Sequence, residues 1–351
     1  MHDSGLIEPK QWTEVMSIEG TWFETLTGFS EESPQQVRKN LTVEGNTLRS
    51  RVNGKEWICG ELETPSLAEL RQRVQSSAYQ VGRLSVCEVV ANVQNLHTDE
   101  SYAGALFQVA SQFNLLEMTG PSVTPESGVG IYEDDHTQGP ACAIAAGAGT
   151  IYRNYFAVVN RQIGQSGTNQ IDCMADLGEA LGNSEGRLWK MRNGYALASE
   201  TGLVEISKRL RSLSESEMDG LRQMLRIGIH WDTQVTLSDC SHLVSQAYCS
   251  ALPVAYSQHP SRLWAEFARL VLEAAYEATM CAAILNSKRT GNNRLYLTLL
   301  GGGAFGNKTE WILAGIRRAL NLYRDADLDV AIVSYGSSKP YVKDLVHEAN
   351  T

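Results

Sequence analysis

The chain has 351 residues, with 30 Lys and Arg against 40 Asp and Glu, so its formal net charge is −10. This acidic balance disfavours sequence-independent binding of nucleic acid, which needs a basic surface to neutralise phosphates. A hydrophobic content of 43% is typical of a globular chain. No apolar run approaches the length of a membrane span, so we expect no membrane partner. The cysteines are scattered without CxxC spacing, which argues against a disulfide framework or a zinc site and favours the cytoplasm.

The first 80 residues mix polar turns with short apolar runs and are predicted to form an accessory layer. Aromatic and apolar side chains recur near helical spacing from Trp22 to Phe29. The Asn53-Gly54 dipeptide favours a hairpin turn, and residues 67–79 predict a helix. Residues 81–351 are then expected to form the second, larger domain.

From residue 84 onward, segments that predict strands alternate with segments that predict helices. The Val-rich run 84–93 is typical of a buried parallel strand. Strands or hairpins are also predicted over 188–198, 227–236, 243–254, 294–300 and 328–335, and helices over 102–118, 140–156, 203–213, 215–225, 261–287 and 308–322. This alternation predicts an α/β fold whose mostly parallel sheet is covered on both faces. Ligands of such folds gather at the carboxyl ends of the strands.

The predicted strand 294–300 continues into the run Gly301-Gly302-Gly303-Ala304-Phe305-Gly306-Asn307, and a predicted helix follows. Consecutive glycines let the backbone approach a ligand closely, and free N–H groups at a helix start suit a diphosphate. A flexible connection between strand and helix is an equal alternative for a glycine run alone. A Walker loop is excluded because no Lys-Ser/Thr pair follows at the required spacing.

This loop and the strand that ends in the run LDVAIVSYG resemble the second phosphate loop and the final strand of macrodomains. The similarity is greatest to the poly(ADP-ribose) glycohydrolase branch, where a Gly-x-Gly-Ala-Phe-Gly loop holds the diphosphate of ADP-ribose. The resemblance implies a macrodomain-like mixed sheet over residues 84–336 and no cofactor. It also implies that Phe305 packs against the proximal moiety of the ligand.

A second macrodomain hallmark is expected after an earlier strand. The run 89–95 resembles the motif ANxxN, whose second Asn binds the distal ribose, so the resemblance implies that role for Asn95. An Asn that closes a turn through its own side chain is the alternative. In the glycohydrolases a later helix carries Gln-Glu-Glu. Here the Gln is kept at Gln112, but Phe113 and Asn114 stand in place of the two Glu residues. The chain is therefore either a non-catalytic reader of ADP-ribose, or it takes its catalytic carboxylates from elsewhere.

Two other segments offer carboxylates. An acidic loop that ends at Asp135 is followed by Thr137, Gln138 and a Pro at the start of a predicted helix, where the positive helix end suits an anion. A capped helix with solvated acids before it is the alternative. Asp232 and Asp239 lie seven residues apart, where loops at strand ends can bring two carboxylates together. Their alternative is a pair of solvated or capping acids.

The runs TQGPACA, WDTQVT, YCSALPVAY and LLGGGAFGN together resemble the macrodomain ADP-ribosyl hydrolases of the MavL type. These enzymes remove ADP-ribose from arginine, with ubiquitin as the known target class. The resemblance implies that Asp232 and Asp239 are the catalytic pair, which would stabilise an oxocarbenium-like state and orient water. The ADP-ribose contacts that we expect are Asn95, Gln112, Phe113, Asn114, Asp135, Thr137, Gln138 and the loop Gly301, Gly302, Gly303, Ala304, Phe305, Gly306 and Asn307. Hydrolysis of another ADP-ribose linkage, and binding without cleavage, remain the alternatives.

Overall fold

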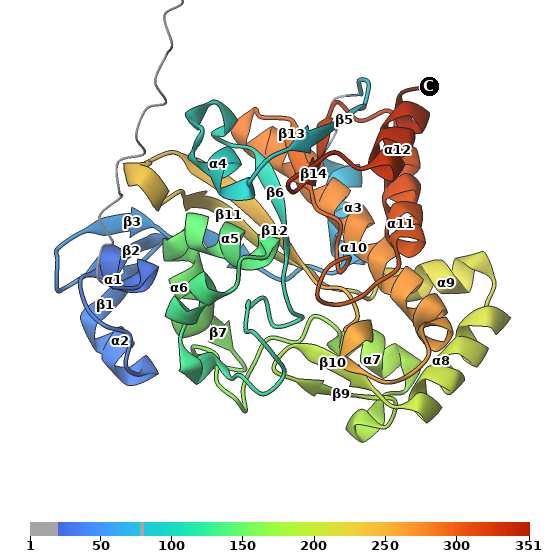
Figure 1. Ribbon diagram of the computed structural model, residues 1–351, viewed down its shortest axis with the longest axis horizontal. Helices are drawn as coiled ribbons and strands as arrows, with labels where there is room; N and C mark the ends of the chain where they lie inside the picture. The colour runs from blue at the N-terminus through green and yellow to red at the C-terminus, as the bar shows by residue number, and fades with distance from the viewer. Residues whose placement is uncertain (1–19, 78–80) are drawn as a thin grey trace, which may run out of the picture.

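The computed structural model describes residues 20–77 and 81–351, and its centre is a seven-stranded mixed sheet (Figure 1). The strands lie in the order β4-β11-β12-β6-β13-β14-β5. Their bounds are β4 (Glu61–Glu63), β5 (Ser85–Val90), β6 (Leu106–Ala110), β11 (Gly228–Gln234), β12 (Leu243–Cys249), β13 (Arg294–Leu297) and β14 (Asp329–Ser334). All neighbours from β12 to β5 pair in parallel, whereas β11 is antiparallel to both β12 and β4. The predicted α/β class with a mostly parallel sheet is confirmed.

Helices cover both faces of this sheet. On β6, Phe107 stacks on His97 of α4, with ring centroids 3.9 Å apart. The next residue, Gln108, donates a 2.9 Å hydrogen bond to Thr279 Oγ1 of α10. Successive side chains of a strand point to opposite faces, so α4 and α10 lie on opposite sides. The helices that follow β5 in the chain are α4 (Val93–Thr98), α5 (Gln138–Ala145), α6 (Gly147–Tyr155), α7 (Ala175–Leu181), α8 (Glu200–Ser212), α9 (Glu215–Arg222), α10 (Ser261–Thr290), α11 (Thr309–Leu322) and α12 (Pro340–Asn350).

The helix predicted over residues 102–118 is wrong. Residues 106–110 form β6, a strand whose first four side chains are buried between β12 and β13, and a loop follows it. The prediction failed because periodicity does not distinguish a short apolar strand that is buried on both faces from a buried helix. The strand predicted over 84–93 is confirmed as β5, but it lies at the edge of the sheet and is only partly buried.

Two further predictions are refined. The helix predicted over 140–156 is divided into α5 and α6 at Ala146, whose ψ of 58° is not helical. The hairpin predicted over 188–198 is confirmed as β9 (Trp189–Arg192) and β10 (Tyr195–Ala198). A second short hairpin joins β7 (Val158–Val159) and β8 (Gln162–Ile163).

The N-terminal residues do not all form one layer. The N-terminal block, which we define as residues 20–58, lies beside α6 (Figure 1) and shares a small core with it. Its elements are α1 (Trp22–Thr27), α2 (Pro34–Asn40), β1 (Leu41–Glu44), β2 (Thr47–Ser50) and β3 (Glu56–Ile58), with the predicted turn at Asn53-Gly54 between the last two strands. In contrast, β4 joins the main sheet, and α3 (Leu67–Ser76) packs against α10. The end of the helix predicted over 67–79 lies outside the described residues.

Three further features concern the cysteines, the potential metal ligands and the length and polarity of the helices. All seven cysteines are free thiols. Within residues 20–77 and 81–351, His, Cys, Asp and Glu side chains are nowhere grouped as three or more potential metal ligands. None of the helices that the structure describes combines the length and the apolar character needed to cross a membrane.

Candidate active site

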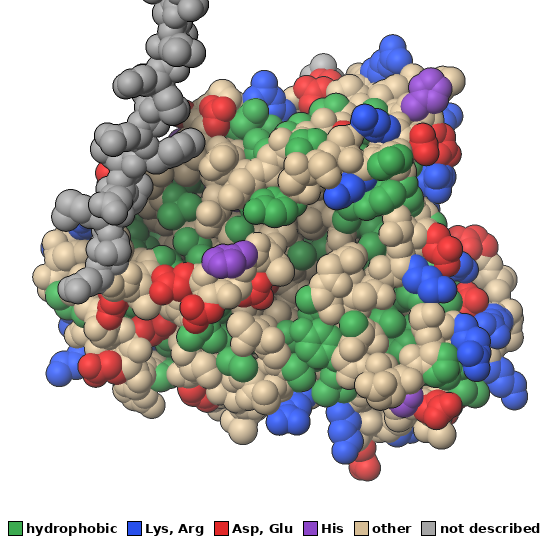
Figure 2. Space-filling view, viewed as in Figure 1, with side chains coloured by type: hydrophobic (Ala, Val, Ile, Leu, Met, Phe, Trp, Pro, Cys, Tyr) green, Lys and Arg blue, Asp and Glu red, His purple; other side chains and the backbone are tan. Residues whose placement is uncertain are grey.

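A cavity with two chambers opens at the carboxyl ends of β6 and β13. The inner chamber has a volume of about 180 Å³ and the outer chamber about 780 Å³. Residues that line both are Asp135, Thr137, Gln138, Thr298, Leu299 and Gly303. Figure 2 shows that this face of the molecule is hollowed near its centre, with acidic side chains gathered beside the hollow. The position agrees with the rule that ligands of α/β folds bind at the carboxyl ends of the strands.

The glycine loop lies between the two chambers. Gly301 and Gly306 have φ values of 70° and 69°, which residues with a side chain rarely adopt. Asn307 closes the loop and attaches it to the residues after β12. Its N–H donates to Gly301 O at 2.9 Å, and its Nδ2 donates to Leu252 O at 2.8 Å. The N–H groups of residues 303–305 donate no hydrogen bond to any residue that the structure describes. Because Gly303, Ala304 and Phe305 line the inner chamber, these N–H groups are available to an anion.

A pair of glycine substitutions tests this role of the loop. A Cβ at Gly303 meets nothing within 4 Å, so Gly303→Val should fold normally and narrow the cavity. For ADP-ribose, the ligand that the sequence resemblance implies, we expect this variant to lower the affinity at least ~10-fold in calorimetry, with an unchanged melting temperature. At Gly301 a Cβ would lie 2.5 Å from Ala251 Cβ, so Gly301→Ala should instead lower the melting temperature. Unchanged affinity in Gly303→Val would contradict a ligand at this loop.

Glu117 places a buried carboxyl group in the inner chamber. Its side chain is 2% exposed, and Oε1 has no hydrogen-bond partner among the described residues. Burial raises the pKa of Glu117 well above its usual value. Nearby Asp135 acts in the same direction, whereas the Arg153 guanidinium opposes the shift. The net upward shift of the pKa favours the protonated form of the Glu117 carboxyl group, which can donate a proton into the chamber.

The loop that carries Glu117 is held in a strained conformation. Leu115 has a φ of 65°, which is unusual for a residue with a side chain. Gln112 closes the loop, because its amide donates to Met118 O at 3.1 Å and accepts from Met118 N at 2.9 Å. Buried Arg153 donates from Nε to Leu115 O at 3.1 Å. These bonds hold the backbone on both sides of Glu117.

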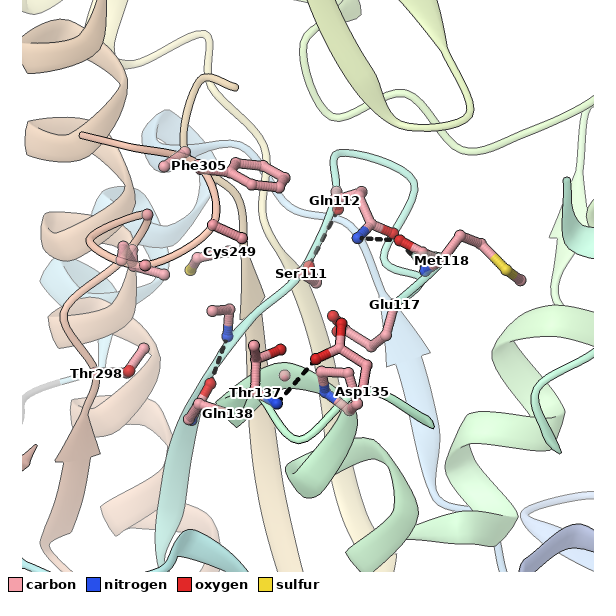
Figure 3. A pocket seen from close by; sticks show the side chains of 18 of the residues that line it. Ser111, Gln112, Glu117, Met118, Asp135, Thr137, Gln138, Cys249, Thr298 and Phe305 are labelled. Carbon is pink, nitrogen blue, oxygen red and sulfur yellow. Dashed lines mark hydrogen bonds between the residues drawn. The ribbon is translucent and has the colours of Figure 1, made fainter. Parts of the chain in front are cut away.

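Asp135 has a different environment from Glu117. It is partly exposed, lines both chambers, and accepts a 2.9 Å hydrogen bond from the Thr137 N–H at the start of α5. Figure 3 shows the two carboxyl groups side by side. Two carboxyl groups in unequal environments can divide the roles of proton donor and charge stabiliser. The inner chamber therefore contains the side chains needed for acid-assisted bond cleavage.

An aromatic cluster closes the inner chamber next to the glycine loop. The Phe305 ring lies 5.3 Å from Tyr195 and 5.6 Å from Tyr256, measured between ring centroids. Cys249 also lines the chamber, and burial raises the pKa of its thiol to about 11. The neutral thiol is therefore a packing residue rather than a nucleophile.

The outer chamber is wider and more apolar. Its wall includes Trp22, Ala141, Ile144, Ile312, Val333, Tyr335 and Tyr341. Asn92, Gln94 and Lys339 add polar groups. A mostly apolar slot with aromatic side chains and a few polar groups suits a nucleoside.

Most of the expected ligand contacts around the loop and α5 line the cavity, but some support it from behind. Gln138 lines both chambers, yet its side chain is engaged with β6, since Oε1 accepts from Ala110 N at 2.9 Å and Nε2 donates to Gln108 O at 2.9 Å. Gly306 and Asn307 shape the loop without lining either chamber.

Three other residues that we expect to contact the ligand line neither chamber. Phe113 is a core side chain, and Asn114 is fully buried with its amide bonded to Gln170 Oε1 at 2.9 Å. Neither lines a chamber, because the loop after β6 turns them away from the cavity. Asn95 lies within α4, and its neighbours Asn92 and Gln94 line the outer chamber instead.

The two aspartates predicted as the catalytic pair also lie outside the cavity. Asp232 and Asp239 line neither chamber. Asp232 Oδ2 instead accepts a 2.6 Å bond from Arg289. The reason is the direction of the strands. Because β11 is antiparallel to β12, and β12 is parallel to β6, the carboxyl end of β11 lies at the end of the sheet opposite the cavity. Glu117 was not among the predicted site residues, although a single acid inside the apolar run QFNLLEM is a signal that could have identified it.

Comparisons with known proteins give only distant likenesses. No protein-family model and no curated protein matches the sequence. Among solved structures, the poly(ADP-ribose) glycohydrolase of Deinococcus radiodurans in complex with ADP-ribose is 11% identical, with a TM-score of 0.43, over 82% of this chain and 90% of that one. The poly(ADP-ribose) glycohydrolase of Thermomonospora curvata bound to the inhibitor ADP-HPD is 12% identical, with a TM-score of 0.41, over 90% of this chain and 94% of that one.

Proposed function

We propose that the chain binds ADP-ribose and hydrolyses the bond between its distal ribose and a modified protein side chain. The observation that carries the proposal is the layout of the cavity. Free N–H groups of the glycine loop separate an apolar outer chamber from an inner chamber with two carboxyl groups. The resemblance of the run GGGAFGN to the phosphate loop of macrodomains supports the same ligand.

The three parts of ADP-ribose match the three parts of the cavity. In this arrangement the adenosine occupies the outer chamber, and the diphosphate lies against the N–H groups of residues 303–305. The distal ribose enters the inner chamber beside Glu117 and Asp135. A net charge of −10 is compatible with this anionic ligand because backbone N–H groups, rather than Lys or Arg, face the diphosphate.

The chemistry assigns separate roles to the carboxyl groups. Cleavage of the glycosidic bond passes through a state in which the anomeric carbon carries positive charge. Protonated Glu117 donates a proton to the leaving group as that bond breaks. Ionised Asp135 stabilises the developing positive charge and orients the water whose oxygen then bonds to the anomeric carbon. The water proton returns to the carboxylate of Glu117 or to solvent.

We further propose that the modified side chain is arginine, with ubiquitin as a candidate protein. The resemblance to the MavL-type hydrolases supports this linkage. So does the carboxylate of Asp135, which lines the inner chamber where the distal ribose and its arginine would lie. Carboxylates can hold a guanidinium through paired hydrogen bonds.

A panel of linkages tests the proposal. Peptides carrying ADP-ribose on arginine, serine or glutamate would be incubated with the protein, and release of ADP-ribose would be followed by mass spectrometry. We expect turnover of the arginine-linked peptide alone, and binding of free ADP-ribose in calorimetry. Binding without turnover of any peptide would indicate a reader, and turnover of the serine or glutamate peptide would reassign the linkage.

A further inference from the structure

One short turn connects the N-terminal block to both carboxyl groups of the inner chamber. This turn consists of the 3-10 helix η3 (Gly130–Asp134) and its N-cap residue Val129. Its Tyr132 is fully buried, and the Tyr132 hydroxyl oxygen accepts a 3.0 Å hydrogen bond from the Glu117 N–H. Asp135 follows directly, and its N–H donates to Tyr132 O at 3.2 Å. A displacement of the turn would therefore move Glu117 and Asp135 together.

The carboxylate of Glu31, which belongs to the N-terminal block, binds the first residues of this turn. Oε1 accepts from the Val129 N–H at 3.0 Å and from the Tyr155 hydroxyl at 2.6 Å, and Oε2 accepts from the Gly130 N–H at 2.6 Å. The approach is so close that a Cβ on Gly128 would lie 2.4 Å from Glu31 Oε2, and Gly128 has a φ of 87°. One carboxylate thus satisfies two consecutive N–H groups of the turn and one hydroxyl of α6.

Trp22, at the start of α1, attaches the same turn to the block a second time. Its Nε1 donates to Val129 O at 3.0 Å, and its backbone N–H donates to Glu133 Oε2 at 2.9 Å. Trp22 also lines the outer chamber. The N-terminal block therefore contacts the turn at Val129, Gly130 and Glu133 and contributes to the wall of the cavity.

We propose that Glu31 is a positioning residue for the proposed hydrolase, acting on Glu117 and Asp135 through this turn. It lines neither chamber, so it touches no substrate. Its contribution is to hold the turn, and through Tyr132 the Glu117 backbone, in the arrangement that places both carboxyl groups beside the distal ribose. This inference rests on the proposed function. A misplacement of a reacting group by about 1 Å can lower a rate ~100-fold.

The variant Glu31→Gln tests the inference, because it keeps the shape but replaces one accepting oxygen with an NH₂ group that cannot accept. Glu44→Gln is the matched control, since Glu44 is an exposed carboxylate on β1 of the same block. We expect Glu31→Gln to lower kcat about 10- to 100-fold, while ADP-ribose affinity in calorimetry changes less than ~3-fold. The amides of Val129, Gly130 and Glu117 should exchange faster with solvent. Glu44→Gln should match the wild type in all three measurements.

The outcomes separate this inference from the proposed function. If the wild type is active and Glu31→Gln turns over at the same rate, the positioning role is overturned while the proposed function stands. If the wild type cleaves no substrate, the proposed function fails, and faster exchange of the Glu117 amide in Glu31→Gln still decides whether the turn couples the two residues. Should Glu31→Gln not fold, Tyr155→Phe removes one of its hydrogen bonds and should lower kcat in the same direction by a smaller factor. An unchanged kcat in that variant would count against the inference.

Discussion

Replacing Glu117 with Gln is expected to lower turnover of ADP-ribosyl-arginine by about 10²- to 10⁴-fold, the range for loss of general acid catalysis. The amide has nearly the same shape as the protonated carboxyl group but has no acidic proton to give. ADP-ribose should still bind, because the glycine loop and the outer chamber are untouched. Single-turnover assays together with calorimetry measure the two effects separately. Full activity of Glu117→Gln would remove this residue from the mechanism.

The raised pKa of Glu117 gives the same substitution a pH dependence. Because the acid acts in its protonated form, wild-type activity should fall as pH rises through the pKa of Glu117 in the folded protein. That fall should come at a higher pH than an ordinary glutamate would give. In Glu117→Gln this alkaline limb should be absent from the residual rate. The pH–rate profiles of the two proteins provide the comparison.

The substitution Glu117→Gln should raise stability although it lowers activity. Because the folded-state pKa of Glu117 is raised, its favourable contribution to folding is present below the unfolded pKa and is lost as pH rises through the folded pKa. Gln is neutral throughout, so the melting temperature of Glu117→Gln should exceed that of the wild type by a margin that grows as pH rises above the ordinary pKa of a glutamate, about 4.3, toward the raised pKa of the folded protein. A difference that shrinks over this range would contradict the raised pKa.

The features that could be predicted from the sequence are those that depend on residues close together in the chain. A strand, a run of glycines and a helix need only local geometry, and the glycine loop does connect β13 to α11. The alternation of strands and helices likewise predicted the sheet and its ligand-binding edge. The turn predicted at Asn53-Gly54 is present because Gly54 readily adopts its φ of 73°.

The features that could not be predicted depend on residues far apart in the chain. The direction of β11 is set by its pairing with β12 and β4, and nothing within the run WDTQVT encodes it. The chemistry of Glu117 arises from its burial and from the strained loop after β6; a single acid in an apolar run can indicate burial, but it does not show that the carboxyl group enters the cavity. The strand β6 resembled a helix because both of its faces are covered, so it lacks the alternation of a half-exposed strand.

Asparagine substitutions at Asp135 and Asp232 should distinguish the two candidate sets of carboxylates. Asp135→Asn removes the negative charge from the inner chamber and should lower kcat by about 10²- to 10⁴-fold, because the charge that develops at the anomeric carbon loses its nearest exposed anion. Asp232→Asn should leave turnover within ~3-fold of the wild type. Its φ of 51° is one that Asn tolerates, and its partly exposed ion pair with Arg289 is worth only about 0–1 kcal/mol.

The reverse result has an equally definite meaning. If Asp232→Asn and Asp239→Asn lost activity while Asp135→Asn kept it, the reaction would take place at the end of the sheet opposite the cavity. The pair implied by the resemblance to the MavL-type hydrolases would then be restored. Melting temperatures of all three variants provide the control, because a loss of activity counts only where the fold is intact. The inner chamber brings Asp135 and Glu117 to one space, whereas Asp232 is engaged by Arg289, so the first result is the one that the geometry favours.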